Sequence, residues 1–200
     1  MGRQSSMLLT LHALRLLGFA YTASVAHRFH QDPDDVERLL IEAGANRWAV
    51  SSSFGGTRGW SLTVAGRTEN ERLLAEQLDS AGGRVAVNGV LADFGPLNEQ
   101  VVAACSRLQL QWLSAGHRPN PAIDAQTHQG FTRALTSLMD LEARLTAVLA
   151  RFGGYTDRLR KAVENAATDP AWLTATDRDS FHRIWFELHE DLISTLGIQR

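Results

Sequence analysis

The sequence is poor in features that define several large classes of protein. It has one cysteine, Cys105, which cannot form an intramolecular disulfide, so we expect a reducing, cytoplasmic setting. The longest apolar stretch, 7–20, is interrupted by His12 and Arg15 and is too short to span a bilayer. No small-x-small cleavage site follows a clean apolar run, so a signal peptide is not indicated either. We therefore expect no membrane association.

Enzyme and metal-site motifs are also missing from the sequence. It contains no glycine-rich phosphate loop, no G-x-S-x-G and no CxxC, and its acidic residues are scattered rather than paired in apolar stretches. His182 and His189 would lie about 10 Å apart along a helix axis, too far to share one metal ion. We predict no enzymatic activity, cofactor or metal. A helical enzyme or metal protein is the weakest hypothesis, motivated only by these two histidines.

The charge is balanced, and lysine is nearly absent. The net charge is −2, and Lys161 is the only lysine among 20 basic residues. Divided at Gly83, the chain has 8 basic against 9 acidic residues before the division and 12 against 13 after it. This excludes a uniformly basic nucleic-acid binder, while 44% apolar residues over 200 positions exclude a disordered chain. Any DNA binding must depend on a few well-placed arginines.

Residues 7–83 show helix patterns followed by strand patterns. Thr22 is expected to cap a short helix over 23–30, and Asp32 to cap a third helix that starts at Pro33. Gly44 stands where a C-terminal glycine of that helix belongs. The other expected elements are a helix over 8–19, strands at 47–51 and 59–64 around a glycine-rich turn at 54–58, and a helix at 69–80. The expected buried stripe of the third helix is Val36, Leu39, Leu40 and Ala43.

Residues 84–200 are predicted to be all helical. Gly95-Pro96 is expected to interrupt the first helix, because proline cannot freely continue one. Asn98 follows this break, where it could cap the restarted helix or accept a hydrogen bond from a ligand; capping is the favoured interpretation. The expected segments are helices over 85–113, 124–151, 155–167 and 177–196, with a loop at 115–121.

Ordered sequence motifs support a family resemblance. The N-terminal region resembles the MarR-like winged helix-turn-helix regulators through Thr22-Ala23-Ser24-Val25-Ala26, the Val36-to-Gly44 pattern and Leu62-Thr63-x-x-Gly66-Arg67. The C-terminal region is similar to the helical half of an actinobacterial subset of these regulators through Phe94-Gly95-Pro96-Leu97-Asn98, Cys105 and residues 181–192. The resemblance implies a mainly α fold with a small β-wing: a winged helix-turn-helix DNA-binding domain at 7–83 and a helical dimerisation and effector domain at 84–200.

Two features depart from that family. Only about six residues precede the first helix, so the long N-terminal dimerisation helix is missing and a homodimer would have to form through C-terminal helices. The third helix also opens with four acidic residues, which would repel phosphates if they faced DNA. These acids either cap the helix or make the region a protein-interaction module. They are Asp32, Asp34, Asp35 and Glu37.

The DNA contacts are expected on exposed positions near the third helix and on the wing. Arg58, flanked by glycines near the hairpin turn, suits insertion into a minor groove, although a solvated loop charge is the simpler alternative. Arginine can read guanine through two hydrogen bonds, and serine can contact phosphate. The predicted contact residues are His27, Arg28, Gln31, Arg38, Arg47, Ser52 and Arg58.

A second candidate site lies in the C-terminal region. His182, Trp185 and His189 fall on one face of the last predicted helix, and with Asn98 they are candidates to line a small-molecule pocket. A packed helix with a wet edge is the simpler interpretation. Together these observations predict a homodimeric, sequence-specific, double-stranded-DNA-binding transcriptional regulator, with a small-molecule effector as a further expectation for the C-terminal region. The alternative is a winged-helix module that binds protein instead of DNA.

Overall fold

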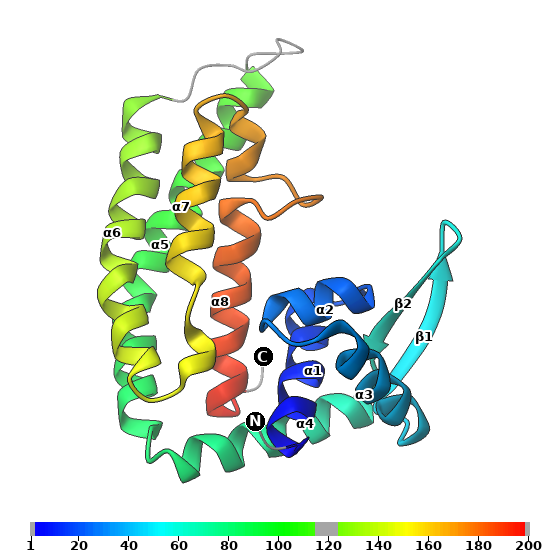
Figure 1. The fold of residues 1–200 in the computed structure, drawn as a ribbon. Coiled ribbons are helices and arrows are strands. Elements are labelled where there is room, and N and C mark those ends of the chain that lie inside the picture. Colours follow the sequence, from blue (N-terminus) through cyan, green and yellow to red (C-terminus); the bar gives the residue numbers. More distant parts are fainter. Residues whose placement is uncertain (1–2, 115–123, 199–200) are drawn as a thin grey trace. The chain divides into compact units, whose positions relative to one another are not determined.

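The computed structural model describes residues 3–114 and 124–198 and is mainly helical, with one two-stranded antiparallel sheet (Figure 1). It divides into two compact units. The N-terminal unit runs to Ser80 and includes the residues from Ile193 on; the C-terminal unit is Ala81–Leu192. No helix within the described ranges combines the length and apolar content that a membrane crossing requires.

The N-terminal unit contains three helices, a hairpin and a fourth helix. Its elements are α1 (Arg3–Leu17), α2 (Thr22–Arg28), α3 (Pro33–Ala45), β1 (Ala49–Phe54), β2 (Thr57–Leu62) and α4 (Val64–Ser80). Between α1 and α2, Ala20 forms an antiparallel bridge with Trp60 of β2, through backbone hydrogen bonds of 3.0 and 2.8 Å. The hairpin is thereby attached to the segment that joins α1 to α2.

The start of α3 follows local capping chemistry. Asp32 Oδ1 accepts hydrogen bonds from the backbone N–H groups of Asp34 and Asp35, at 3.0 and 3.1 Å, and Pro33 occupies the first helical position. These contacts confirm the predicted cap. The predicted buried stripe is confirmed as well: Val36, Leu39, Leu40 and Ala43.

Two other predicted helix ends are wrong. Thr22 is the first residue of α2 and not its cap, because its hydroxyl donates to Glu37 of α3 at 2.6 Å. Gly44 does not end α3, which continues to Ala45. A Cβ atom at Gly44 would lie 3.4 Å from the ring of Trp60, an ordinary van der Waals distance, so Gly44 lies where α3 packs on β2.

The hairpin turns on two glycines. Gly55 and Gly56 have φ angles of 58° and 81°, a left-handed pair that suits a two-residue turn. Phe54 and Thr57 on either side of them already belong to the paired strands, so the predicted five-residue turn is too long. Alternation along the strands places Ala49 and Trp60 on the face that packs on the core.

Thr63 joins the two ends of the hairpin. Its hydroxyl donates to the carbonyl of Arg47 at 2.6 Å and accepts from the N–H of Gly66, in the first turn of α4, at 3.0 Å. A Cβ atom at Gly66 would lie 1.8 Å from the carbonyl oxygen of Trp48, so no side chain fits there. The Leu62-Thr63-x-x-Gly66-Arg67 motif therefore closes the hairpin and starts the next helix.

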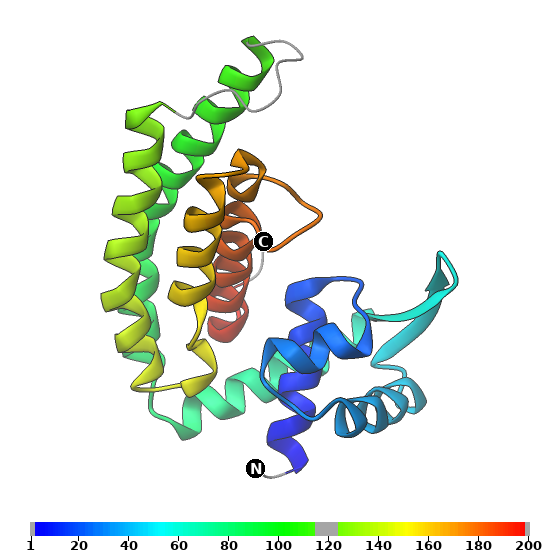
Figure 2. The same cartoon turned by 45° about the horizontal axis from the view of Figure 1, so that its top comes forward.

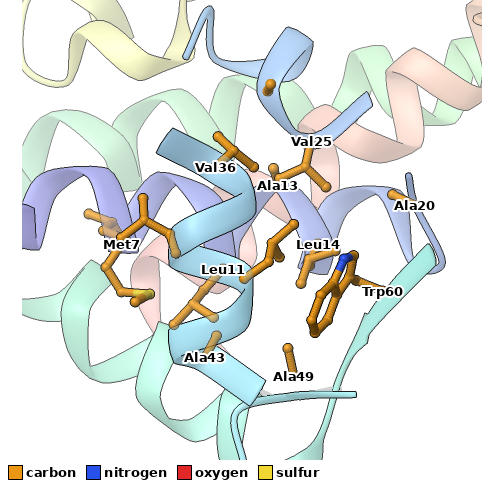
Figure 3. Close-up of a cluster of buried hydrophobic side chains, with 14 of the residues drawn as sticks. Met7, Leu11, Ala13, Leu14, Ala20, Val25, Val36, Ala43, Ala49 and Trp60 are labelled. Atoms are coloured by element: carbon orange, nitrogen blue, oxygen red, sulfur yellow. The ribbon is translucent and has the colours of Figure 1, made fainter. Parts of the chain in front are cut away.

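The core of the N-terminal unit lies between α1, α3 and the hairpin (Figure 3). Leu11, Leu14 and Leu40 are almost fully buried, and Trp60 is 3% exposed. Burying one such side chain contributes about 1.5–3 kcal/mol. At the edge of this core, Arg15 of α1 forms an ion pair with Glu71 of α4 at 2.8 Å. Apolar packing and one ion pair thus fix α1 between the other elements.

The C-terminal unit is built from long helices (Figure 2). Its elements are α5 (Arg84–Ser114), α6 (Ala125–Thr146), the 3-10 turns η1 (Ala150–Phe152) and η2 (Pro170–Leu173), α7 (Tyr155–Ala166) and α8 (Phe181–Leu196, to Leu192 in this unit). The predicted interruption at Pro96 is wrong, because α5 is continuous through it. Ala92 and Pro96 are exposed, so water can bond the carbonyl that proline leaves unpaired. The predicted loop at 115–121 lies outside the described residues.

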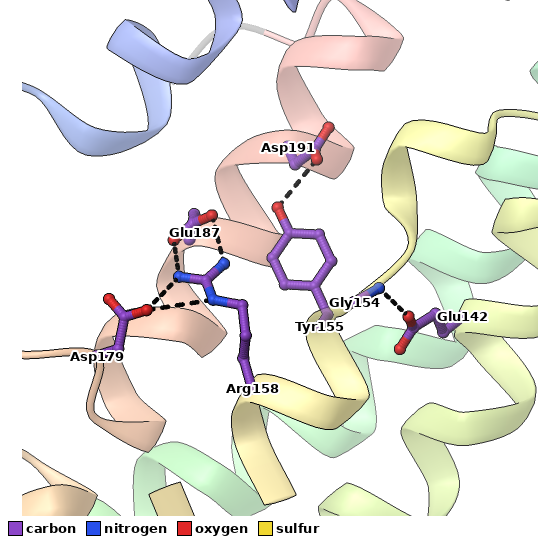
Figure 4. Close-up of polar contacts among 7 residues, drawn as sticks. All are labelled: Glu142, Gly154, Tyr155, Arg158, Asp179, Glu187 and Asp191. Carbon is purple, nitrogen blue, oxygen red and sulfur yellow. Dashed lines mark hydrogen bonds and ion pairs between the residues drawn. The ribbon is translucent and has the colours of Figure 1, made fainter. Parts of the chain in front are cut away.

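Buried charges join α7 and α8 (Figure 4). Arg151 of η1 pairs with Asp191, which is fully buried and also accepts the hydroxyl of Tyr155 at 2.9 Å. Arg158 donates two hydrogen bonds of 2.8 Å to Glu187. Burial opposes the charge of Arg158, but the hydrogen bonds to Glu187 and the nearby carboxylates raise its pKa overall.

Glu142 of α6 caps α7 from outside the helix. It accepts from the backbone N–H groups of Gly154 and Thr156, at 2.5 and 2.6 Å, as Figure 4 shows for Gly154. A carboxylate at a helix N-terminus bonds N–H groups that have no partner inside the helix and also favours the helix dipole. This contact therefore fixes the start of α7 against α6.

Candidate nucleic-acid interface

The acidic residues at the start of α3 have contacts within the unit. Asp32 caps the helix, Asp35 forms an ion pair with Arg38, and Glu37 accepts the hydroxyl of Thr22. Asp34 is exposed. The capping interpretation therefore accounts for Asp32, while Asp32, Asp34 and Asp35 remain exposed at the start of α3.

Three arginines around the hairpin have no carboxylate partner among the described residues. Arg47 precedes β1, Arg58 lies in β2 and Arg67 lies in the first turn of α4. All three are exposed. Thr63 connects two of them, since its hydroxyl bonds the carbonyl of Arg47 and its own carbonyl accepts the N–H of Arg67 at 2.9 Å. The two ends of the hairpin thus carry a pair of available cations on a fixed backbone.

Other arginines of the same unit are engaged. Arg72 binds Glu69 and Glu76 within α4, and Arg38 binds Asp35. The hydrogen bond from Arg72 lowers the pKa of Glu69, although partial burial of that carboxyl opposes the shift. Positive charge free to meet a phosphate is therefore concentrated around the hairpin.

Arg58 lies on β2, two residues after the turn, and not in the turn itself. It is opposite Ser53 in the strand register, and its guanidinium lies 4.5 Å from the ring centroid of Trp60, two residues further on. A contact of this kind at an exposed site is worth about 0.5–1 kcal/mol. It orients the side chain while leaving its N–H groups available.

The remaining predicted contact residues differ in exposure. His27 is exposed, with its ring centroid 6.2 Å from that of His30, and Ser52 is exposed on β1 opposite Gly59. Gln31 is half-buried, and its amide donates to the carbonyl of Ser6 at 3.2 Å, which ties the α2–α3 turn to α1. Of these three residues, His27 and Ser52 present side chains to solvent.

The expectation that Arg28 is exposed is wrong. Arg28 is 9% exposed, and its guanidinium lies 4.5 Å from the ring centroid of Phe29. Arg28 follows the buried Val25 by three positions on α2, so the two side chains share the buried face of that helix. Arg67, by contrast, was not among the predicted contacts. Its place in the Leu62-Thr63-x-x-Gly66-Arg67 motif beside the hairpin could have identified it.

The residues of the predicted ligand pocket fall in an aromatic cluster of the C-terminal unit. The indole N–H of Trp185 donates to Asn98 at 3.0 Å, so Asn98 binds a side chain and does not cap a helix. Phe94 stacks on Trp185 with ring centroids 4.8 Å apart and lies 5.5 Å from His189. Trp185 is 1% exposed. A small-molecule site at these residues stays a prediction.

His182 lies at the edge of this cluster. Its ring meets Phe186 edge-on, with centroids 4.6 Å apart. Partial burial lowers the pKa of His182, which favours the neutral imidazole at pH 7. The structure therefore brings Asn98, Trp185 and His189 together around Phe94, whereas the ring contact of His182 is with Phe186.

Neither the arrangement of possible metal ligands nor comparison with known proteins indicates a function. Within residues 3–114 and 124–198, no group of three or more histidine, cysteine or acidic side chains is arranged to hold a metal ion. Comparison of the chain with protein-family models, with curated proteins and with solved structures gives no match.

Proposed function

We propose that the N-terminal unit is a winged helix-turn-helix module that binds double-stranded DNA, within a homodimeric transcriptional regulator. The observation that carries the proposal is the set of three exposed arginines around the hairpin, Arg47, Arg58 and Arg67, which have no carboxylate partner among the described residues. Phosphate neutralisation supplies much of the affinity for DNA, and it requires cations that are not already paired.

The order of elements supports this module. The chain runs through α1, a one-residue bridge at Ala20, α2, α3 and the β1–β2 hairpin. The bridge attaches the hairpin to the segment between α1 and α2. In a winged helix-turn-helix, the helix after the turn enters the major groove and the wing contacts the backbone or the minor groove. On this proposal α3 is the recognition helix and Arg58 reaches the minor groove.

Affinity for DNA would come mainly from the hairpin, and preference for a particular base sequence from α3 and its neighbours. Arg47 and Arg67 are placed to contact phosphates at the two ends of the hairpin, while Arg38 and His27 are the exposed candidates for base contacts. Because the arginines are few, we expect DNA binding to weaken only moderately as the salt concentration rises. Each phosphate contact contributes about 0.9 to that slope.

The test is a salt titration of DNA binding by the full chain. Fluorescence anisotropy would be measured with a labelled duplex from upstream of the protein's own gene and with an unrelated duplex. We expect the triple variant Arg47→Ala/Arg58→Ala/Arg67→Ala to lower the salt slope by about 1.8 on both duplexes, because Arg47 and Arg67 are the two proposed phosphate contacts.

The matched control is Arg133→Ala. This arginine is exposed on α6, so its removal changes the net charge by one without touching the hairpin. We expect its salt slope to equal that of the wild type. A triple variant whose affinity and slope match those of Arg133→Ala would refute the assigned docking face.

The second candidate function is protein binding through α3. A groove of about 640 Å³ runs between α1 and α3, and Ile41 beside it is 54% exposed. Two acidic side chains and one basic side chain, Asp35, Glu42 and Arg38, also line this groove, a combination that suits an amphipathic helix with a small excess of basic residues. Under this hypothesis the wild type binds such a peptide and Ile41→Glu does not, while DNA affinity is absent from both.

Regulation by a small molecule is the further part of the proposal. An effector can change DNA binding only if it has unequal affinity for the DNA-competent and incompetent arrangements. The cluster around Phe94 is the proposed place because Asn98 and Trp185 supply a polar pair within an aromatic core. Binding of an effector there requires the Trp185–Asn98 hydrogen bond to open, which tryptophan fluorescence would report.

A further inference from the structure

The second half of α5 presents an uncharged face to solvent. Between Gln100 and Ser114 the only charged residue is Arg107, which is half-buried, although 21% of the whole chain is charged. The opposite side of this half packs into the unit through Val101, Ala104, Cys105 and Leu108. The exposed residues of this half are Gln100, Val102, Ala103, Ser106, Gln109, Leu110, Leu113 and Ser114. We name five of them the α5 stripe: Val102, Ala103, Ser106, Leu110 and Leu113.

The α5 stripe is strongly apolar at one end. Leu110 is 63% exposed and Leu113 is 78% exposed, while Val102 is 48% exposed. Such large apolar side chains gathered on one helix face indicate an interaction surface, because interface cores are depleted of charge. A partner must therefore offer an apolar surface of matching shape.

The spacing within the α5 stripe suits a helix partner. Ala103, Ser106, Leu110 and Leu113 are separated by three, four and three residues, the spacing of a seam along which two helices pack. Along this seam two small side chains precede two large ones. A partner helix fits best when it places large residues against the small pair and small residues against the large pair.

We propose that the partner is a second copy of this chain, with the two α5 helices packed antiparallel. The two-fold axis crosses the seam at the level of Leu108 along the helix. This axis places Ala103 opposite the partner's Leu113, and Ser106 opposite the partner's Leu110. Each leucine then fills the space left by a small residue, and no like charges oppose each other within the seam. A two-fold interface of this kind is self-complementary.

A parallel pairing lacks this fit. It would place each leucine of the pair Leu110 and Leu113 against its own copy and leave Ala103 and Ser106 facing a gap. Gaps in a packed interface remove contacts and weaken it. The distribution of small and large residues therefore selects the antiparallel arrangement.

The inference deepens the homodimer of the proposed function, but it is measured without DNA. Sedimentation equilibrium of the full chain at micromolar concentration should give a dimer. Leu110→Glu should raise the dissociation constant of the dimer by about 100-fold or more, because it buries an unpaired charge at the centre of the seam. Val85→Glu is the matched control, since Val85 is on the same helix, outside the stripe and 85% exposed.

A swap of residues tests the antiparallel register. Ala103→Leu alone should weaken the dimer, because two leucines then meet where one fits. Ala103→Leu combined with Leu113→Ala should restore the dissociation constant toward that of the wild type, since the pair again joins one large and one small residue. In a parallel dimer these positions do not meet, and the double variant would show no rescue. Circular dichroism would verify that each variant is folded.

Three results would overturn the inference: a wild-type monomer, a Leu110→Glu variant that dimerises as well as Val85→Glu, or a swap without rescue. Loss of DNA binding with an intact dimer would overturn the proposed function alone. Dimer formation through the stripe without DNA affinity would keep the inference and leave the N-terminal unit to another role.

Discussion

Two sets of arginines, one in each unit of the molecule, are used in opposite ways. In the C-terminal unit Arg151 and Arg158 are held by the carboxylates of Asp191 and Glu187. Around the hairpin of the N-terminal unit, Arg47, Arg58 and Arg67 are exposed and have no such partner in the described part of the chain. The two halves of the sequence have almost equal charge sums, so the sum does not reveal this difference. Availability of charge, and not its total, separates the two regions.

The comparison has an energetic side. A charge taken out of water loses hydration worth several kcal/mol, which a close opposite charge and hydrogen bonds must offset. A surface arginine keeps its hydration and stabilises the fold by little. A buried arginine therefore stays paired with its carboxylate, whereas an exposed arginine can bind a ligand such as a phosphate.

The largest expected effect is from breaking a buried pair. Arg151→Met should lower the free energy of unfolding of the C-terminal unit by about 3–5 kcal/mol, because it leaves the fully buried Asp191 without its cation. Denaturant titration of the full chain measures this loss. Arg160→Met removes a largely exposed pair with Asp157 and should change stability by less than about 1 kcal/mol.

A double variant keeps the prediction testable even if Arg151→Met does not fold. Arg151→Met combined with Asp191→Leu removes both charges and should recover part of the loss, because no unpaired charge stays buried. If Arg151→Met lowers the free energy of unfolding no more than Arg160→Met does, buried and exposed arginine pairs do not differ in their contribution to stability.

An intermediate effect is expected from a buried group that has no charge partner to stabilise its ionised form. Burial raises the pKa of the Cys105 thiol from 9.0 to about 11. Between these pH values the unfolded chain ionises at Cys105 and the folded chain does not, so stability falls as pH rises. The loss should be on the order of 2 kcal/mol.

Denaturant titrations at pH 8 and pH 10.5 would measure this effect. Cys105→Ala should lose less stability over the same interval, because it lacks the thiol. Equal losses in the two proteins would show that the interior of this unit tolerates a thiolate without a cation.

The smallest effect is expected at the hairpin. Arg58→Met should change the stability of the N-terminal unit by less than about 1 kcal/mol, since it removes only the contact with Trp60. Thermal unfolding followed by circular dichroism is the measurement. A larger loss would mean that Arg58 is structural, and its assignment to DNA would be weakened.

Local chemistry made part of the fold predictable. The cap at Asp32, the proline at the first helical position and the buried stripe of α3 depend on neighbouring residues, and all three were predicted. The hairpin was expected from its glycines and alternating strands. Its turn was overestimated, because the left-handed conformation of Gly55 and Gly56 lets the strands begin immediately.

Contacts between distant residues were not predictable in the same way. Asn98 accepts from Trp185, which is 87 positions away, and no local pattern announces such a pair. Arg28 is buried on the same face of α2 as Val25, and which face of a short helix is buried depends on residues distant in the sequence. Arg47 and Arg58 were predicted as contacts from the sequence, but the absence of a carboxylate partner for them among the described residues is known only from the structure.

Thr63 has a consequence for the entropy of binding. Because it bonds the backbone of both Arg47 and Arg67, these two residues start from positions already fixed in the free protein. Arg58 lies beyond that closure, near the far end of the hairpin, where its backbone is opposite Ser53 of β1. A ligand held by the first two arginines orders less of the chain on binding than one held by Arg58. The base of the hairpin is therefore preorganised for contact, and the tip keeps the freedom to adapt.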